Sequence, residues 1–179
     1  MKLISRMLLL FMLVTLNTPL IAADETTIDW SSAKEIKSLI KLKLEPQNGE
    51  VTYGPNFAFS DKLISDKFSE VYLSRIVDPE DEEHYVLFIT TLHNEKNWRA
   101  YNQAARKNGD ALSIVTISRT EDVTNNDKIY KHEERLAIKM GFIEFADSSS
   151  IGLDLIISGN KTDNIKIPSS YFLAMLQTM

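Results

Sequence analysis

The chain has 179 residues, with 20 Lys and Arg against 25 Asp and Glu, a formal net charge of −5, and no cysteine. A protein this acidic, without a dense basic patch, is a poor match for nucleic acid or for an anionic membrane surface. We therefore expect no nucleic-acid partner. The lack of cysteine excludes disulfides, a thiol nucleophile and a lipid attached to an N-terminal cysteine, so the fold must be held by packing.

The first 23 residues have the layout of a bacterial-type signal peptide. Lys2 and Arg6 precede an apolar run from Met7 to Leu16, and small residues suited to cleavage follow at Ala22 and Ala23. A membrane-spanning helix needs ~20 apolar residues, and this run is shorter. The pattern predicts a periplasmic or secreted protein, with no stable membrane insertion after signal cleavage.

Residues 24–179 remain after cleavage, with 18 basic and 25 acidic residues and a net charge of −7, because the leader takes Lys2 and Arg6 with it. This length suits one domain with a real hydrophobic core. The chain shows no internal repeat, no linker and no low-complexity tract. We predict a single domain.

Secondary-structure signals in the first part of this domain are mixed. Ser32 and Glu35 have the spacing of a capping box and predict a helix over about 33–41. Turn-forming residues at 45–49 end it, and the pattern of residues 50–66 leaves their structure open.

From residue 69 the apolar period changes to two, which is typical of strands. The expected strands are 69–77, 84–93, 98–105, 111–118, 130–140, 153–158 and 165–167. Residues 86–89 are apolar on both faces, as in a central strand covered on both sides.

Residues 98–105 also fit a helical face, but Asn108-Gly109 follows them and favours a hairpin with a type I′ turn. One or two helical turns at 142–148 and a last helix from about residue 168 complete the pattern. The expected fold is mainly β: an antiparallel β-sandwich of six or seven short strands with a short N-terminal helix and a short C-terminal helix.

The second half of the chain carries a series of short motifs, namely Trp98-Arg99-x-Tyr101-x-x-Ala104, Gly109, Leu112, Ile117-Ser118-Arg119, His132-x-Glu134, Gly152-x-x-x-x-Ile157-x-Gly159 and Ile167-Pro168-x-x-Tyr171 with Leu176. Together they resemble a family of small uncharacterised exported bacterial proteins, many of them lipoproteins, over about residues 85–177. The resemblance implies a β-rich exported domain in which 98–104 form a strand, and it implies no activity. Relatives often carry a cysteine pair in the loop after the arginine, and lipoprotein members carry one at the cleavage site; this chain has neither.

Strand 130–140 has the most unusual pattern. Its expected buried face, marked by Leu136 and Ile138, also carries His132 and Glu134. A carboxylate beside the core needs a partner. Arg119, expected on the face of Val115 and Ile117 at the end of the preceding strand, lies within reach in a hairpin. The pattern predicts an Arg119–Glu134 pair with His132 adjacent, which is either a structural ion pair or a site for recognition or acid–base chemistry.

Aromatic residues offer a second candidate binding surface. Trp98 and Tyr101, together with Trp30 and Tyr171, are either exposed on a binding face or packed in the core. The candidate binding residues are therefore Arg119, His132, Glu134, Trp98 and Tyr101.

No metal site or cofactor is expected. His132 lacks the second histidine of H-E-x-x-H, and His84 and His93 would point to opposite faces of one strand, so surface or capping roles are favoured for the histidines. The acidic run 78–83 lacks the spacing and glycine of an EF-hand loop and is interpreted as a solubilising loop.

With no recognisable chemistry, we expect a non-enzymatic exported protein that binds another envelope protein or serves it as an accessory factor. The alternative is a small periplasmic hydrolase using His132 with Glu134. An enzyme needs these groups to converge in a concave pocket, whereas a binding module needs an exposed apolar patch or an unpaired strand edge.

Overall fold

The computed structural model describes residues 28–45, 49–95, 97–124 and 129–178. The predicted signal peptide and its cleavage site lie outside these residues. In this part of the chain, no helix has the length and apolar character needed to cross a membrane.

The described elements are α2 (Ala33–Ser38), β1 (Lys41–Glu45), β2 (Gly49–Tyr53), η1 (Phe57–Ser60), α3 (Lys62–Ser65), β3 (Phe68–Val77), β4 (Glu83–His93), β5 (Gln103–Arg106), β6 (Ala111–Thr124), β7 (Ile129–Met140), α4 (Phe142–Ile151), β8 (Leu153–Ser158), β9 (Thr162–Ile167) and α5 (Ser169–Leu176).

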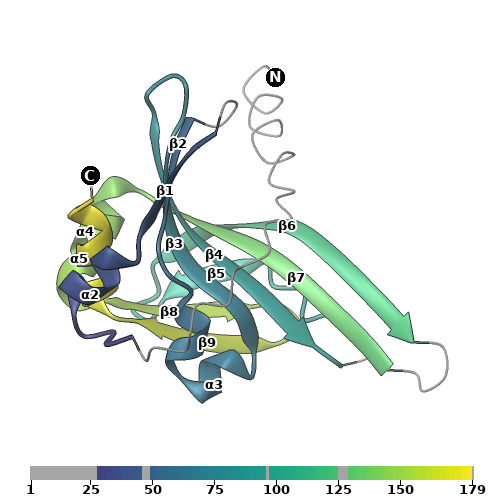
Figure 1. The fold of residues 1–179 in the computed structure, drawn as a ribbon. Helices are drawn as coiled ribbons and strands as arrows, with labels where there is room; N and C mark the ends of the chain where they lie inside the picture. Colours follow the sequence, from purple (N-terminus) through teal and green to yellow (C-terminus); the bar gives the residue numbers. More distant parts are fainter. Residues whose placement is uncertain (1–27, 46–48, 96, 125–128, 179) are drawn as a thin grey trace.

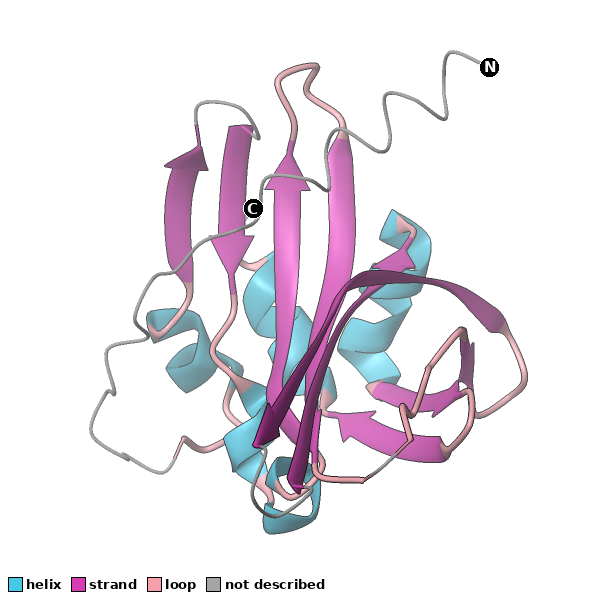
Figure 2. Ribbon diagram, turned by 90° about the vertical axis from the view of Figure 1, so that its right-hand side faces the viewer, coloured by secondary structure: helices cyan, strands magenta, loops and turns pink. Residues whose placement is uncertain are grey.

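The strands form one antiparallel sheet in the order β1-β2-β3-β4-β7-β6-β5-β8-β9 (Figure 1). Strand direction changes progressively across the sheet, so that it curls instead of lying flat (Figure 2). The prediction of a mainly β, antiparallel fold is confirmed, but the β-sandwich was wrong. β5 pairs with both β6 and β8, and the strands that would have made a second sheet therefore continue the first.

The helices α2, α4 and α5 lie together at one end of the curled sheet, against its inner face (Figure 1). Phe145 and Phe172 from α4 and α5 join Leu87 and Leu136 of the sheet in one buried cluster. The α5 residue Tyr171 is fixed further, because its hydroxyl donates to the Pro55 carbonyl at 2.6 Å. The predicted C-terminal helix is therefore part of the core.

β4 is the central strand that the sequence predicts. Its inner-face residues Leu87 and Ile89 belong to the main core. Its outer-face residues Val86 and Phe88 pack with Ala137 in a second, smaller cluster. Both faces of this strand are thus covered, which explains its unbroken apolar run.

The N-terminal region differs from expectation. The predicted helix is present and Ser32 caps it by accepting the backbone N–H of Glu35, but it ends at Ser38. Residues 41–45 form β1, which pairs with β2 in a hairpin that the sequence analysis missed. Within the open region 50–66, η1 begins where the Asn56 side chain accepts the N–H of Ala58.

Two predictions for residues 98–110 also need correction. Residues 98–102 are not a strand, and β5 begins only at Gln103. The hairpin of β5 with β6 is confirmed by the pairing of Ala104 with Leu112. Its turn is not type I′, because Gly109 has a φ of +97° and Asn108 does not have a positive φ.

β6 and β7 are longer than predicted and form a ribbon that extends beyond the other strands (Figure 1). β7 also pairs with β4 as far as His132, opposite His93. A register shift between Thr116 and Ser118 marks a bulge in β6. Past this bulge the faces of β6 are exchanged relative to simple alternation.

Candidate functional site

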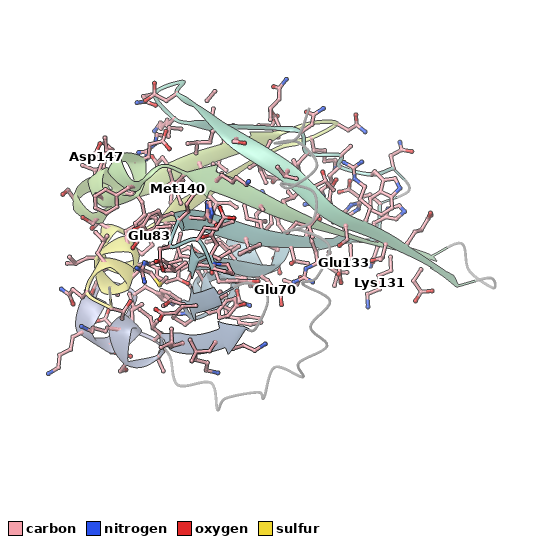
Figure 3. The ribbon with its side chains drawn as sticks, turned by 90° about the horizontal axis from the view of Figure 1, so that it is seen from above. Glu70, Glu83, Lys131, Glu133, Met140 and Asp147 are labelled. Carbon is pink, nitrogen blue, oxygen red and sulfur yellow. The ribbon has the colours of Figure 1, made fainter. Side chains whose placement is uncertain are left out.

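A group of polar side chains lies on the inner face of the sheet, on the parts of β4, β7 and β6 that are distant from the helices. Two adjacent rows cross these three strands in register: His93–His132–Glu121, and Thr91–Glu134–Arg119. We call the residues of these rows, with Trp98, Arg99, Tyr101 and Asp163, the polar cluster. In Figure 3, Glu133 and Lys131, which flank His132 in sequence, lie toward the free end of the ribbon, far from Met140.

The predicted ion pair is confirmed. Arg119 Nε lies 2.6 Å from Glu134 Oε1, with the Glu134 side chain 0% exposed and that of Arg119 41% exposed. The backbone N–H of Tyr101 donates to the other carboxylate oxygen at 3.5 Å.

The predicted face of Arg119 was wrong. Ile117 packs on the outer cluster, whereas Arg119 lies opposite Glu134 on the inner face. The bulge in β6 causes this difference, because one extra residue reverses the alternation that would have placed Arg119 with Ile117.

His132 is 1% exposed, and its Nε2 lies 3.1 Å from Glu121 Oε1. The Trp98 ring stacks on its imidazole, with centroids 4.2 Å apart and an interplanar angle of 25°. On the other side lies His93, whose ring centroid is 5.1 Å away. The imidazole of His132 is therefore held in place by side chains from three separate segments.

His93 is the least satisfied residue of the cluster. It is buried, and neither of its ring nitrogens has a hydrogen-bond partner among the described residues. Burial, helped by the positive charge of Arg99, lowers its pKa below the ordinary value. The preference for surface or capping histidines was thus wrong for His93 and His132. Only His84 is partly exposed, and it lies 3.4 Å from Asp78.

The segment 97–102, which contributes Trp98, Arg99 and Tyr101 to the polar cluster, has an irregular conformation. Ala100 has a φ of +50°, which is unfavourable for a residue with a Cβ. The turn between β8 and β9 holds this segment, because Asn160 donates its backbone N–H to the Arg99 carbonyl at 2.8 Å and its side-chain N–H to the Trp98 carbonyl at 3.0 Å. These bonds fix a conformation that buries both Arg99 and Tyr101.

Asp163 lies on β9, the last strand in the sheet order, and contacts the segment 97–102. Its carboxylate accepts the hydroxyl of Tyr101 and lies 2.7 Å from Lys67 Nζ, beside the start of β3. Arg99 lies 3.7 Å away. Burial alone would raise the pKa of Asp163, but the bonds from Lys67 and Tyr101 outweigh burial and hold the pKa below its ordinary value. Burial and the bond to Asp163 raise the pKa of Tyr101.

All five residues chosen from the sequence are therefore members of one cluster. For the aromatic residues the packing alternative holds: Tyr101 and Tyr171 are buried, and Trp98 and Trp30 are partly buried. Four other cluster members were not predicted from the sequence, namely Thr91, Arg99, Glu121 and Asp163, and His93 was expected on the surface. The sequence does carry a signal that His93 is buried, because His93 lies on the same strand face as Leu87 and Ile89.

The arrangement offers little for hydrolysis. A general base must reach the proton that it abstracts, but His132 and Glu134 are buried and Glu134 is already paired. The acidic loop provides no better centre. Asp78, Glu82 and His84 bring ligand atoms within 4.8 Å of one another, yet Asp78 Oδ1 accepts the backbone N–H groups of Glu80 and Glu82 and so shapes the turn.

Comparison of the chain with family models, with curated proteins and with solved structures finds no match. The resemblance of residues 85–177 to small exported bacterial proteins therefore stays a prediction.

Proposed function

We propose that this protein is an exported, non-enzymatic binding module that attaches to an extended segment of another envelope protein along the edge of β1. One observation carries the proposal: Leu42 and Leu44, on one face of this edge strand, are 61% and 75% exposed. In the described sheet β1 pairs only with β2.

The position of β1 at the edge of the described sheet and its alternating exposed leucines support strand addition as the binding mode. The edge offers backbone N–H and C=O groups to an incoming strand, and alternate side chains then select the partner. The partner strand would carry apolar side chains against Leu42 and Leu44. An acidic side chain would suit the exposed Lys41.

Export is the second part of the proposal, and it is supported by the signal-peptide pattern of the first 23 residues. We expect the protein recovered from the periplasm to begin at Ala23 or Asp24, which intact-mass measurement would show. Full-length chain retained in the membrane would contradict this part.

A pull-down from periplasmic extract tests the binding mode. The bait is the recovered protein, either unchanged or carrying Leu44→Asp. Both versions should fold, because Leu44 is largely exposed, but the added charge should reduce recovery of the partner roughly ten-fold, as expected for an apolar contact replaced by a buried charge. Leu63→Asp on α3 is the matched control, since Leu63 is 74% exposed. Equal recovery with both variants would exclude β1 as the binding edge.

A further inference from the structure

The residues of the row His93–His132–Glu121 have no part in the strand addition proposed at β1. It places two imidazoles and one carboxylate on one face of three adjacent strands, with His132 on the middle strand directly opposite both His93 and Glu121. Directly opposed residues have Cβ atoms ~4.5–5.5 Å apart, which is close enough for their side chains to share a ligand. We propose that this row binds a divalent transition-metal ion, with Zn²⁺ as the reference ion.

The ring centres of His93 and His132 are as far apart as those of two imidazoles on one metal, but the ligand atoms of His93, His132 and Glu121 do not all lie within 4.8 Å of one another, so Glu121 has to turn to complete the site. Two imidazoles that each place a nitrogen ~2.0–2.1 Å from one zinc ion at a tetrahedral angle have centres roughly 5 Å apart. The centroids of His93 and His132 are 5.1 Å apart. Trp98 stacks on His132 at 4.2 Å and limits rotation of that ring.

His93 supplies the second, independent observation. Both of its ring nitrogens are buried without a hydrogen-bond partner among the described residues. A buried polar group without a hydrogen-bond partner is destabilising, and a bound ion or water is one of the few explanations for its presence. A metal held between the two imidazoles would use one of these nitrogens.

Glu121 supplies the third ligand and the route of entry. Its carboxylate lies 3.1 Å from His132 Nε2, and its side chain is 41% exposed. It can therefore turn toward the metal from the solvent side of β6 while the histidines keep their places. Two imidazoles and one carboxylate form a ligand set that suits zinc, copper or nickel ions better than calcium or magnesium ions.

Calorimetric titration of the purified protein with Zn²⁺, together with the visible absorption of the Co²⁺ form, tests the site. We expect one equivalent of metal to bind. His93→Gln and His132→Gln should each weaken Zn²⁺ binding by about 100-fold or more, and Glu121→Gln by roughly ten-fold. His84→Gln is the matched control, because it removes a histidine from the opposite face and the other end of β4 and should leave the affinity unchanged.

Circular dichroism establishes that each variant is folded. Should the buried histidine variants fail to fold, the unchanged protein, Glu121→Gln and His84→Gln still decide the question, because both of these side chains are at least partly exposed. Absence of stoichiometric binding at millimolar Zn²⁺ would overturn the proposal. So would retained affinity in Glu121→Gln with loss in His84→Gln, which would place the metal at Asp78, Glu82 and His84 instead.

Discussion

The two partners of the Arg119–Glu134 pair differ in exposure, and we therefore expect their substitutions to reduce stability by different amounts. Arg119→Met leaves a fully buried carboxylate without its cation, and loss of one partner from a buried pair costs ~3–5 kcal/mol. Glu134→Gln leaves a half-exposed guanidinium that water can solvate, so we expect only about 1 kcal/mol, the value of an ordinary hydrogen bond.

Urea unfolding of the two single variants and the double variant measures both terms. The double variant should lose less stability than the sum of the singles, by about 0.5–3 kcal/mol, as expected for residues in direct contact. Additive effects, or a larger loss for Glu134→Gln than for Arg119→Met, would contradict this account of the pair.

Asp163 makes a prediction about acid stability. Its folded-state pKa lies below the ordinary value of 3.8, so the folded protein binds fewer protons than the unfolded chain in acid. The stability that Asp163 contributes is present above pH 3.8 and is lost as the pH falls through the lower, folded-state value. Asp163→Asn should therefore be less stable at neutral pH but lose less stability between about pH 6 and pH 3. Parallel pH profiles for both proteins would count against this role.

At the scale of elements, the turn between β8 and β9 holds the irregular segment 97–102 in place. A Cβ added at Gly159 would lie 2.1 Å from the carbonyl oxygen of Ala100. We therefore expect Gly159→Ala to push this segment away and to cost about 3 kcal/mol or more, at the upper end of overpacking effects.

Gly109→Ala is the control for this prediction. Nothing lies within 4 Å of a Cβ at Gly109, but its φ is +97°, so only the backbone penalty of ~1–2 kcal/mol applies. Thermal unfolding of both variants makes the comparison. A smaller loss in Gly159→Ala than in Gly109→Ala would mean that the contact with Ala100 does not hold the segment.

Sequence patterns predict some elements of this protein better than others. Local periodicity predicts β3, β4, β7 and β8 closely, because each alternates cleanly or is apolar on both faces. It fails at β1. The alternating Leu42 and Leu44 come directly after apolar residues with helical spacing, and no turn-forming residue separates the two patterns. It also fails at 98–102, where backbone bonds to the β8–β9 turn override the local preference for a strand.

Only part of the polar cluster could be predicted from the sequence. The face of β7 correctly joined His132 and Glu134, and a hairpin correctly brought Arg119 to them. The bulge that turns Arg119 inward leaves no mark in the composition of β6. Asp163 comes from an edge strand 29 residues beyond Glu134, and its approach depends on how the whole sheet curls.

The curled sheet carries the polar cluster and the exposed leucines of β1 on different strands. The polar cluster joins β4, β6, β7 and β9; most of its side chains are buried, but those of Arg119 and Glu121 are 41% exposed. β1 is the first strand in the order of the described sheet and carries the exposed Leu42 and Leu44. The sandwich prediction was wrong because short antiparallel strands at regular spacing have the same pattern whether they form two packed sheets or one curled sheet. In the one-sheet arrangement, β1 is an edge strand among the strands that the structure describes.

Site-specific photo-crosslinking in the producing cells tests the binding account most directly. A photoreactive residue at position 44 should yield a crosslink to another envelope protein, through a segment that contains apolar side chains at alternate positions. The same residue at position 63, equally exposed on α3, should yield none. A position-44 crosslink only to a second copy of the chain, or the same products from both positions, would contradict the claim that β1 receives a strand from a separate partner.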